Sequence, residues 1–266
     1  MRPIIFFHAL NGVIDADALS FIQAAGITDN TQKRAVNELV VSLKNNLLWT
    51  KAKAIYPIVG GTASSHKWNL KDPRDLDAAY RIAFSGTSTH SSNGITGNGT
   101  TGYGNTFFNA STGFTSNSVA TIAVYIRNNI NYGNTQGVEI GCGVFSGGLT
   151  HTNIWPRFND IFYGQINSIA ISESVANLNS TGFYLAGRNS TAAFIQKNST
   201  QNNFTTTVAA TNLNIYFGAS NNNGTPDFFS GRQSAFGWIS DGLTTAQAST
   251  LYTIVQTYQT TLSRNV

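Results

Sequence analysis

The chain has 266 residues, of which 41% are apolar and 11% are charged, so it can bury a large core while Asn, Thr, Ser and Gly supply most of its polar surface. The net charge is +4, and no basic stripe with interleaved aromatics occurs, which argues against nucleic-acid binding. Cys142 is the single cysteine, so no disulfide can form within the chain. Its alternation with Val138, Ile140 and Val144 predicts a small buried side chain on a strand.

The first fifty residues predict two helices. Asp15 or Asp17 can cap a short helix that runs through residue 25, where Gly26 suits the left-handed backbone of a helix end. A second helix is predicted from Asp29 to about residue 46, because apolar residues recur three and four positions apart. Its apolar face must pack either on the rest of the chain or on a neighbouring subunit. We therefore predict an N-terminal helical docking segment over residues 1–52 and a β domain over residues 53–266.

The remainder of the chain predicts short strands closed by one helix. A strand over 54–59 ends at two glycines, and a capped helical turn is expected to open at Asp72, with Pro73 in its first position. Thr244 and Gln247 have the spacing of a capping box at the start of the last helix. Many short strands with regular turns indicate a mainly β sandwich or barrel. Alternating apolar residues predict strands at 119–127, 136–145, 157–167, 180–188, 192–197, 212–218 and 234–239.

Two stretches resemble known families. Residues 215–220 (IYFGAS), 229–238 (FSGRQSAFGW) and 243–248 (LTTAQA), preceded by the hairpin at 193–199, resemble the last strands and short helix of concanavalin A-like and laminin-G-like domains. This resemblance covers roughly the C-terminal half of the chain. It implies an antiparallel jelly-roll β-sandwich, here with an N-terminal helical segment and a C-terminal helix.

The block at residues 48–73, from LWTK to KDP, resembles a block in structural proteins of tailed bacteriophages, where it precedes a concanavalin A-like domain. The resemblance implies a non-enzymatic virion protein, made in the bacterial host cytoplasm, such as a capsid decoration, a fibre or a tail appendage. It also implies other virion proteins and further copies of the chain as partners. Residues 4–7 are too short an apolar run for a secretory signal, and no run approaches the ~18 apolar residues of a membrane span, so membrane insertion is not expected.

No catalytic or metal-binding motif is recognisable. Glucanases of the concanavalin A-like superfamily need two carboxylates on one strand, but Glu38, Glu139 and Glu173 each lack an acidic neighbour two or four residues away. The histidines share no metal-ligand spacing. The loop at 221–227 has oxygens that would suit calcium, yet its composition favours an ordinary Asn- and Gly-rich loop. We therefore predict neither an enzyme nor a bound cofactor.

Binding of host surface glycans is compatible with the virion role. A sugar site needs an aromatic plane for the apolar ring face and polar groups for the hydroxyls. A carbohydrate-binding receptor module and a glycan depolymerase are the alternatives to a purely structural role. The loop residues that could provide a glycan site are His90, Tyr103, Tyr132, His151, Trp155, Asn223 and Asp227.

Overall fold

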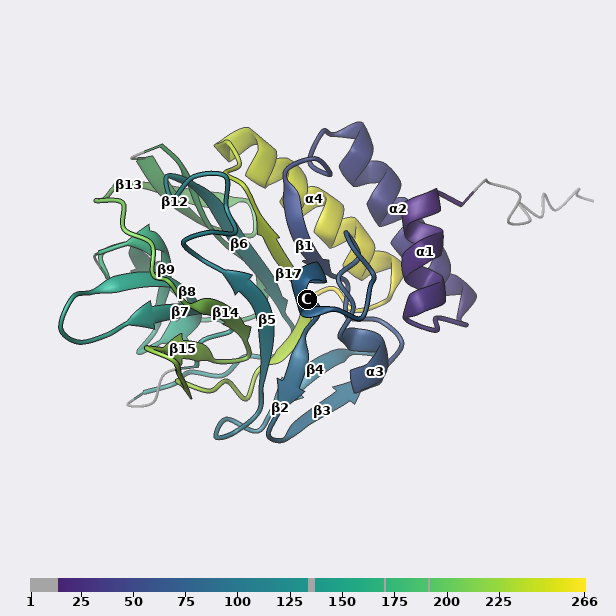
Figure 1. The fold of residues 1–266 in the computed structure, drawn as a ribbon, viewed down its shortest axis with the longest axis horizontal. Helices are drawn as coiled ribbons and strands as arrows, with labels where there is room; N and C mark the ends of the chain where they lie inside the picture. Colours follow the sequence, from purple (N-terminus) through teal and green to yellow (C-terminus); the bar gives the residue numbers. More distant parts are fainter. Residues whose placement is uncertain (1–13, 134–136, 170, 191) are drawn as a thin grey trace, which may run out of the picture.

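Two β-sheets pack face to face in the computed structural model, which describes residues 14–133, 137–169, 171–190 and 192–266 (Figure 1). The first, here called the helix-side sheet, has the order β13 (Thr200–Thr205), β12 (Ala192–Lys197), β11 (Gly182–Asn189), β6 (Val119–Ile126), β17 (Gln233–Ser240), β4 (Gly94–Gly97) and β3 (Ser88–Ser91), with β1 (Ala52–Tyr56) also on β17. The second, here called the open sheet, has the order β10 (Ser174–Ala176), β9 (Ile161–Ser168), β8 (Thr150–Phe158), β7 (Ile140–Val144), β14 (Asn214–Phe217), β5 (Tyr103–Asn109) and β2 (Ala83–Ser85). A hairpin of β15 (Ser220–Asn222) and β16 (Thr225–Asp227) joins the open sheet through β7. The predicted antiparallel sandwich of the jelly-roll type is confirmed.

Helices cover the outer face of the helix-side sheet. α1 (Ala16–Ala24), α2 (Asn30–Asn45) and α4 (Thr245–Thr261) lie together on this side of the sandwich (Figure 1). Asp15, Asp29 and Thr244 cap them with their side chains; Thr244 and one of the pair Asp15 or Asp17 were predicted as caps, and α2 begins after Asp29 as predicted. The apolar face of α2 belongs to one buried cluster with α4 and the outward side chains of the sheet. That face therefore packs on the chain itself, while the boundary at residue 52 stays a prediction.

Two apolar layers explain the patterns along the strands. In β6, Ile122 and Val124 point between the sheets, whereas Ala123 and Tyr125 point toward the helices. Both faces of this strand are buried, which is why its apolar run is continuous. Cys142 lies in the layer between the sheets, as expected for a small apolar side chain, and burial raises the pKa of its thiol.

Two sequence predictions are wrong. No helical turn opens at Asp72, which instead makes an isolated β-bridge with Asn69. The 3-10 helix η1 (Asp77–Ala79) begins five residues later. The short helix α3 (Ala63–His66) was missed. The strand predicted at 157–167 is interrupted, because Asn159 and Asp160 adopt left-handed φ values of 49° and 60° and reverse the chain between β8 and β9. β8 itself was missed. The strand predicted from residue 136 begins at Ile140, and residue 136 lies outside the described residues.

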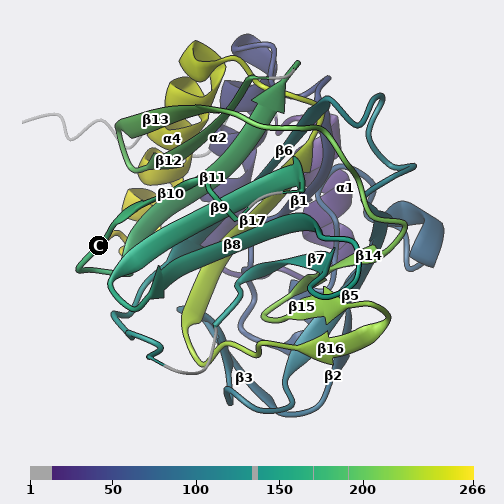
Figure 2. The ribbon, with the colours of Figure 1, turned by 90° about the vertical axis from the view of Figure 1, so that its left-hand side faces the viewer.

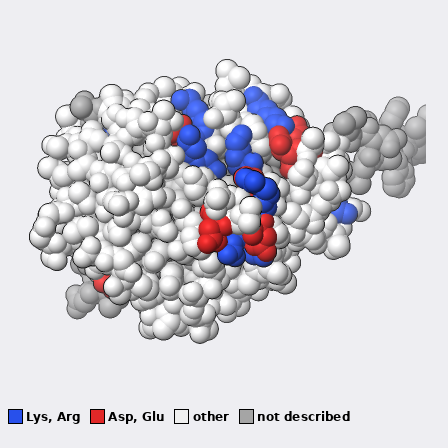
Figure 3. All heavy atoms as spheres, in the orientation of Figure 1, with Lys and Arg blue, Asp and Glu red and all other residues white. Residues whose placement is uncertain are grey.

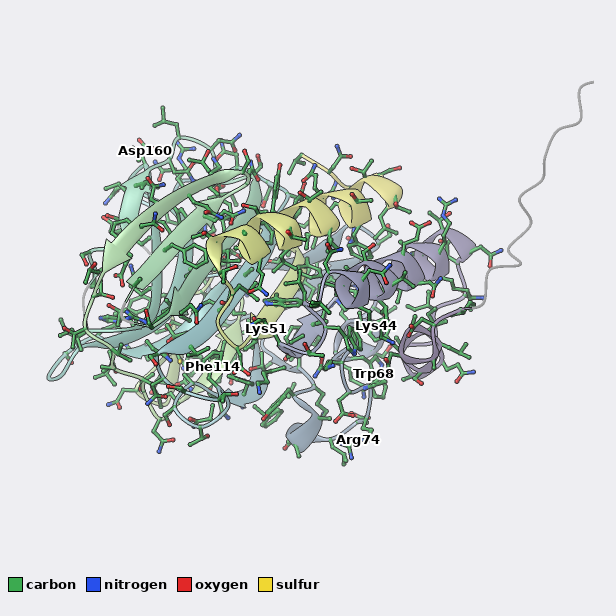
Figure 4. The ribbon with its side chains drawn as sticks, turned by 90° about the horizontal axis from the view of Figure 1, so that it is seen from above. Lys44, Lys51, Trp68, Arg74, Phe114 and Asp160 are labelled. Carbon is green, nitrogen blue, oxygen red and sulfur yellow. The ribbon has the colours of Figure 1, made fainter. Side chains whose placement is uncertain are left out.

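Charged groups gather on the helical side. Figure 3 shows them there and on the adjoining loops, with the sandwich side of this face almost free of them, and Figure 4 places Lys44, Trp68 and Arg74 far from Asp160. Within the described ranges, no helix has both the length and the apolar character needed to cross a membrane. The apolar run at residues 4–7 is outside these ranges. Between residues 82 and 266, the charged side chains that reach the surface are Arg127, Arg157, Asp160, Lys197, Asp227 and Asp241.

Candidate functional site

None of the described helices lies over the outer face of the open sheet, which carries a cluster of aromatic side chains. Figure 2 looks onto this side of the molecule, where β8 and β9 run in front of the helices. Successive side chains of a strand point to opposite faces. Since Ile154 and Phe162 are in the layer between the sheets, the paired neighbours Trp155 and Tyr163 point outward.

These outward rings line a hollow of about 260 Å³. Its walls are Phe145, Trp155, Phe158, Tyr163 and Ile171. The ring of Tyr163 lies 6.3 Å from that of Trp155 and 6.2 Å from that of Phe158, between centroids. Ile171 is 46% exposed, so the apolar rim of the hollow is open to solvent. No charged side chain lines it.

Phe145 is the ring that joins the hollow to the residues beneath it. It follows β7, and its centroid is 4.6 Å from His151, 5.9 Å from Trp155 and 4.7 Å from Phe228. Gly143 permits this close packing, because a Cβ there would lie 3.0 Å from Nδ1 of His151 and 3.1 Å from Phe145. His151 and Trp155 are both outward residues of β8, four positions apart, with Asn153 between them.

The polar atoms of these two residues are not satisfied. Both ring nitrogens of His151 and Nε1 of Trp155 are buried and have no hydrogen-bond partner among the described residues. Burial lowers the pKa of His151 to about 4, so its imidazole is neutral at pH 7. A neutral imidazole has one donor and one acceptor, and the indole has one donor. The site therefore combines an apolar surface with three unused hydrogen-bonding groups.

Two ion pairs lie close to this region. Arg157 pairs with Asp160 at 2.5 Å in the turn between β8 and β9. Arg232 and Glu139 form a buried pair at 2.9 Å between Nη1 and Oε1. Tyr132 packs on this pair, with the Arg232 guanidinium 4.5 Å from its ring. Tyr132 consequently supports a buried ion pair and is not among the residues that line the hollow.

The remaining predicted site residues lie elsewhere. His90 on β3 packs against Phe84, and its Nδ1 is 3.0 Å from Nδ1 of His66. Tyr103 on β5 stacks on Tyr216 with 4.9 Å between ring centroids.

In the hairpin β15–β16, the Asp227 carboxylate accepts from Asn222, and Asn223 is at the tip. The structure brings together only His151 and Trp155 of the predicted set. In the described part of the chain, no three His, Cys, Asp or Glu side chains group as metal ligands do.

The sequence prediction missed Phe145, Phe158 and Tyr163. The signal that could have found Tyr163 is the alternation in 161–168, where this ring falls on the face opposite the core residue Phe162. The glutamates remain separate in their roles: Glu38 pairs with Arg34 on α2, Glu139 with Arg232, and Glu173 is buried with neither oxygen hydrogen-bonded to a described residue.

The architecture places the protein in the class of two-sheet jelly-roll sandwiches, here with an aromatic hollow on the open sheet whose described lining residues are uncharged. No family model matches the chain, and no curated protein matches it by sequence. A mutant sialidase of Trypanosoma rangeli with trans-sialidase activity matches with 12% identity and a TM-score of 0.55, over 85% of this chain and 39% of its own. The chain thus spans well under half of that sialidase, and at this identity the likeness shows the fold alone.

A second structural match is domain 4 of a GH43 extracellular arabinanase from Geobacillus stearothermophilus, solved in complex with arabinotriose. It covers 76% of this chain and 98% of its own, with 13% identity and a TM-score of 0.45. The resemblance of residues 48–73 to phage structural proteins stays a prediction.

Proposed function

We propose that this protein is a non-catalytic carbohydrate-binding module, and that the hollow formed by Phe145, Trp155, Phe158, Tyr163 and Ile171 is its binding site. One observation carries the proposal. The outward rings of Trp155 and Tyr163, on neighbouring strands, line an apolar hollow that opens to solvent at the half-buried Tyr163 and the exposed Ile171, and none of the described residues that line it is charged. The C–H face of a pyranose or furanose ring is apolar, and it packs on such rings while its hydroxyls point to amides, hydroxyls and water.

The open sheet favours a sugar ligand for a further reason. Hydroxyl-rich chains are uncharged and flexible, so they gain from a rigid platform that is already in place when they bind. Tyr163 and Trp155 stand on paired strands within a continuous sheet, and their positions are fixed by the packing of Phe162 and Ile154 on the other side. Tyr163 is half-buried and lines the hollow, so part of this side chain is accessible to a ligand.

A glycan array followed by titration calorimetry of each hit tests the proposal. Tyr163→Ala should weaken binding by about tenfold, because it removes a half-buried ring of the hollow that is more accessible than Trp155. Tyr252→Ala is the matched control: this half-buried tyrosine packs on Phe183 beneath α4, on the helical side of the sandwich, and its loss should leave binding unchanged. Equal affinities for the two variants would refute the assignment of the site. Release of new reducing ends from any bound glycan would instead show a depolymerase.

We also propose that the module is a structural component of a bacteriophage particle. The supporting observations are the resemblance of residues 48–73 and the scarcity of charge on the sandwich, which suits close contact between subunits. In the structure, this block follows α2 and contains β1 and α3, so it joins the helical layer to the sandwich. Mass spectrometry and cryo-electron microscopy of particles of the virus that encodes the chain test the placement. Purified particles without the protein would refute it.

A further inference from the structure

Phe145 packs over buried polar atoms that have no hydrogen-bond partner among the described residues. His151 is fully buried and Trp155 is 5% exposed, yet three of their nitrogens lack a partner among the described residues. A buried polar group without a hydrogen bond is unfavourable, and native structures seldom leave several of them side by side. Phe145 contacts both rings, at 4.6 Å and 5.9 Å between centroids.

The chain beyond Phe145 is an exposed loop that contains two adjacent glycines. Residues 146–149 are exposed and connect β7 to β8. Gly147 and Gly148 have φ values of 74° and 129°, and a Cβ on either would find no atom within 4 Å. Neither glycine is packed against other described residues at its Cα, and both can absorb a change in backbone angles.

We propose that Phe145 is a movable cover, and that its displacement allows His151 and Trp155 to hydrogen-bond the hydroxyls of an uncharged saccharide. The neutral imidazole offers one donor and one acceptor, and the indole offers a second donor. Adjacent hydroxyls of a sugar present both kinds of group. This inference rests on the proposed function, since it names the ligand as a neutral sugar and adds a polar floor to the same hollow. An anionic sugar has no charged partner there.

The cover can be tested without any ligand. The chain has four tryptophans, and the indole N–H groups of Trp155 and Trp238 are both buried, with no hydrogen-bond partner in the part of the chain that the structure describes. Trp238 lies under the helices in the other apolar layer, so it serves as the internal control. Hydrogen exchange followed by NMR should show the Trp155 indole exchanging at least about tenfold faster than that of Trp238, and Phe145→Ala should accelerate only Trp155. Equal, slow exchange of both indoles in the wild type and in Phe145→Ala would overturn the cover.

The hydrogen-bonding role has its own test. The probes are the neutral oligosaccharides arabinotriose, cellotetraose and maltotetraose, with sialyllactose as the anionic comparison. Trp155→Phe keeps an aromatic ring and removes the donor, and it should weaken binding of a neutral probe by about 3- to 10-fold. Trp238→Phe, the matched variant, should leave the affinity unchanged.

The outcomes of these experiments distinguish the proposed carbohydrate site from the movable cover and the polar floor beneath it. Loss of binding in Tyr163→Ala with no change in Trp155→Phe would refute the polar floor and leave the carbohydrate site intact. Preferential binding of sialyllactose would refute the neutral ligand. A wild type that binds no glycan on the array, with fast exchange at Trp155, would refute the proposed function while supporting the movable cover.

Discussion

Replacing Glu139 with Gln should destabilise the protein strongly, although it changes the shape of the side chain very little. Glu139 and Arg232 are both buried, and their Oε1 and Nη1 atoms are 2.9 Å apart. The guanidinium also donates to the carbonyl oxygens of Ile130, Gly137 and Arg157, so all of its N–H groups are used. Removing the carboxylate charge would leave a buried cation with only neutral acceptors.

Breaking a buried ion pair by removing one partner costs about 3–5 kcal/mol. For a chain of this size each kcal/mol corresponds to roughly 2–4 °C in Tm, so Glu139→Gln should melt roughly 6–20 °C below the wild type. Urea unfolding monitored by tryptophan fluorescence gives the free energy of unfolding directly, and calorimetry gives Tm.

Asp72→Asn is the control for loss of an exposed ion pair. Asp72 pairs with Arg74 at 2.5 Å, but their side chains are 32% and 64% exposed. Surface pairs contribute at most about 1 kcal/mol, so this variant should unfold almost as the wild type does. If Glu139→Gln were destabilised no more than Asp72→Asn, the claim that the buried pair depends on its charge would be refuted.

Further predictions follow from burial and close packing. Burial lowers the pKa of His66 to about 3 and that of His151 to about 4, so below pH 6.5 the unfolded chain binds more protons than the folded one. The free energy of unfolding should therefore be highest above pH 6.5 and fall as the pH drops toward 4. Urea unfolding at pH 7 and at pH 5 would show this decrease. Gly141→Ala should destabilise the protein by about 1–3 kcal/mol, because its Cβ would lie 2.1 Å from Oδ1 of Asn153; a change within 0.5 kcal/mol in the same assay would contradict this. Thr244→Ala removes the capping box of α4 and should cost about 1 kcal/mol, whereas Thr244→Ser should restore most of it.

Local signals in the sequence were sufficient for the long helices α1, α2 and α4, although not for the short α3. Asp15, Asp29 and Thr244 have side chains that bond the first free N–H groups of a helix, and this interaction involves residues only two or three positions apart. The continuous apolar run of β6 likewise reports burial on both faces, which the structure confirms. The wrong prediction of a helical turn at Asp72 also came from a local signal, because residues that cap helices occur in turns without a helix as well.

Of the residues in and beneath the hollow, the sequence analysis selected only His151 and Trp155. Trp155 and His151 could be chosen because aromatic and polar residues in a loop-rich stretch suggest a sugar site. Tyr163 and Phe145 could not be joined to them, because the pairing of β8 with β9, and of β7 with β8, depends on how the strands assemble. His90, Tyr103 and Tyr132 share the same composition signal, yet each packs on other partners.

The sequence by itself determined the three long helices, several of the strands and a surface poor in charge, since these follow from composition, periodicity and contacts between near neighbours; it did not show β8, α3 or the chain reversal at residues 159–160. Only the tertiary structure decided that one sheet would be covered by helices and the other left open. The reason is that one apolar stripe on α2 and one on α4 can be buried on the same sheet face, where Tyr125 and Trp238 meet them. No described helix covers the outward rings of the opposite sheet, and strand pairing gathers those rings into a single hollow.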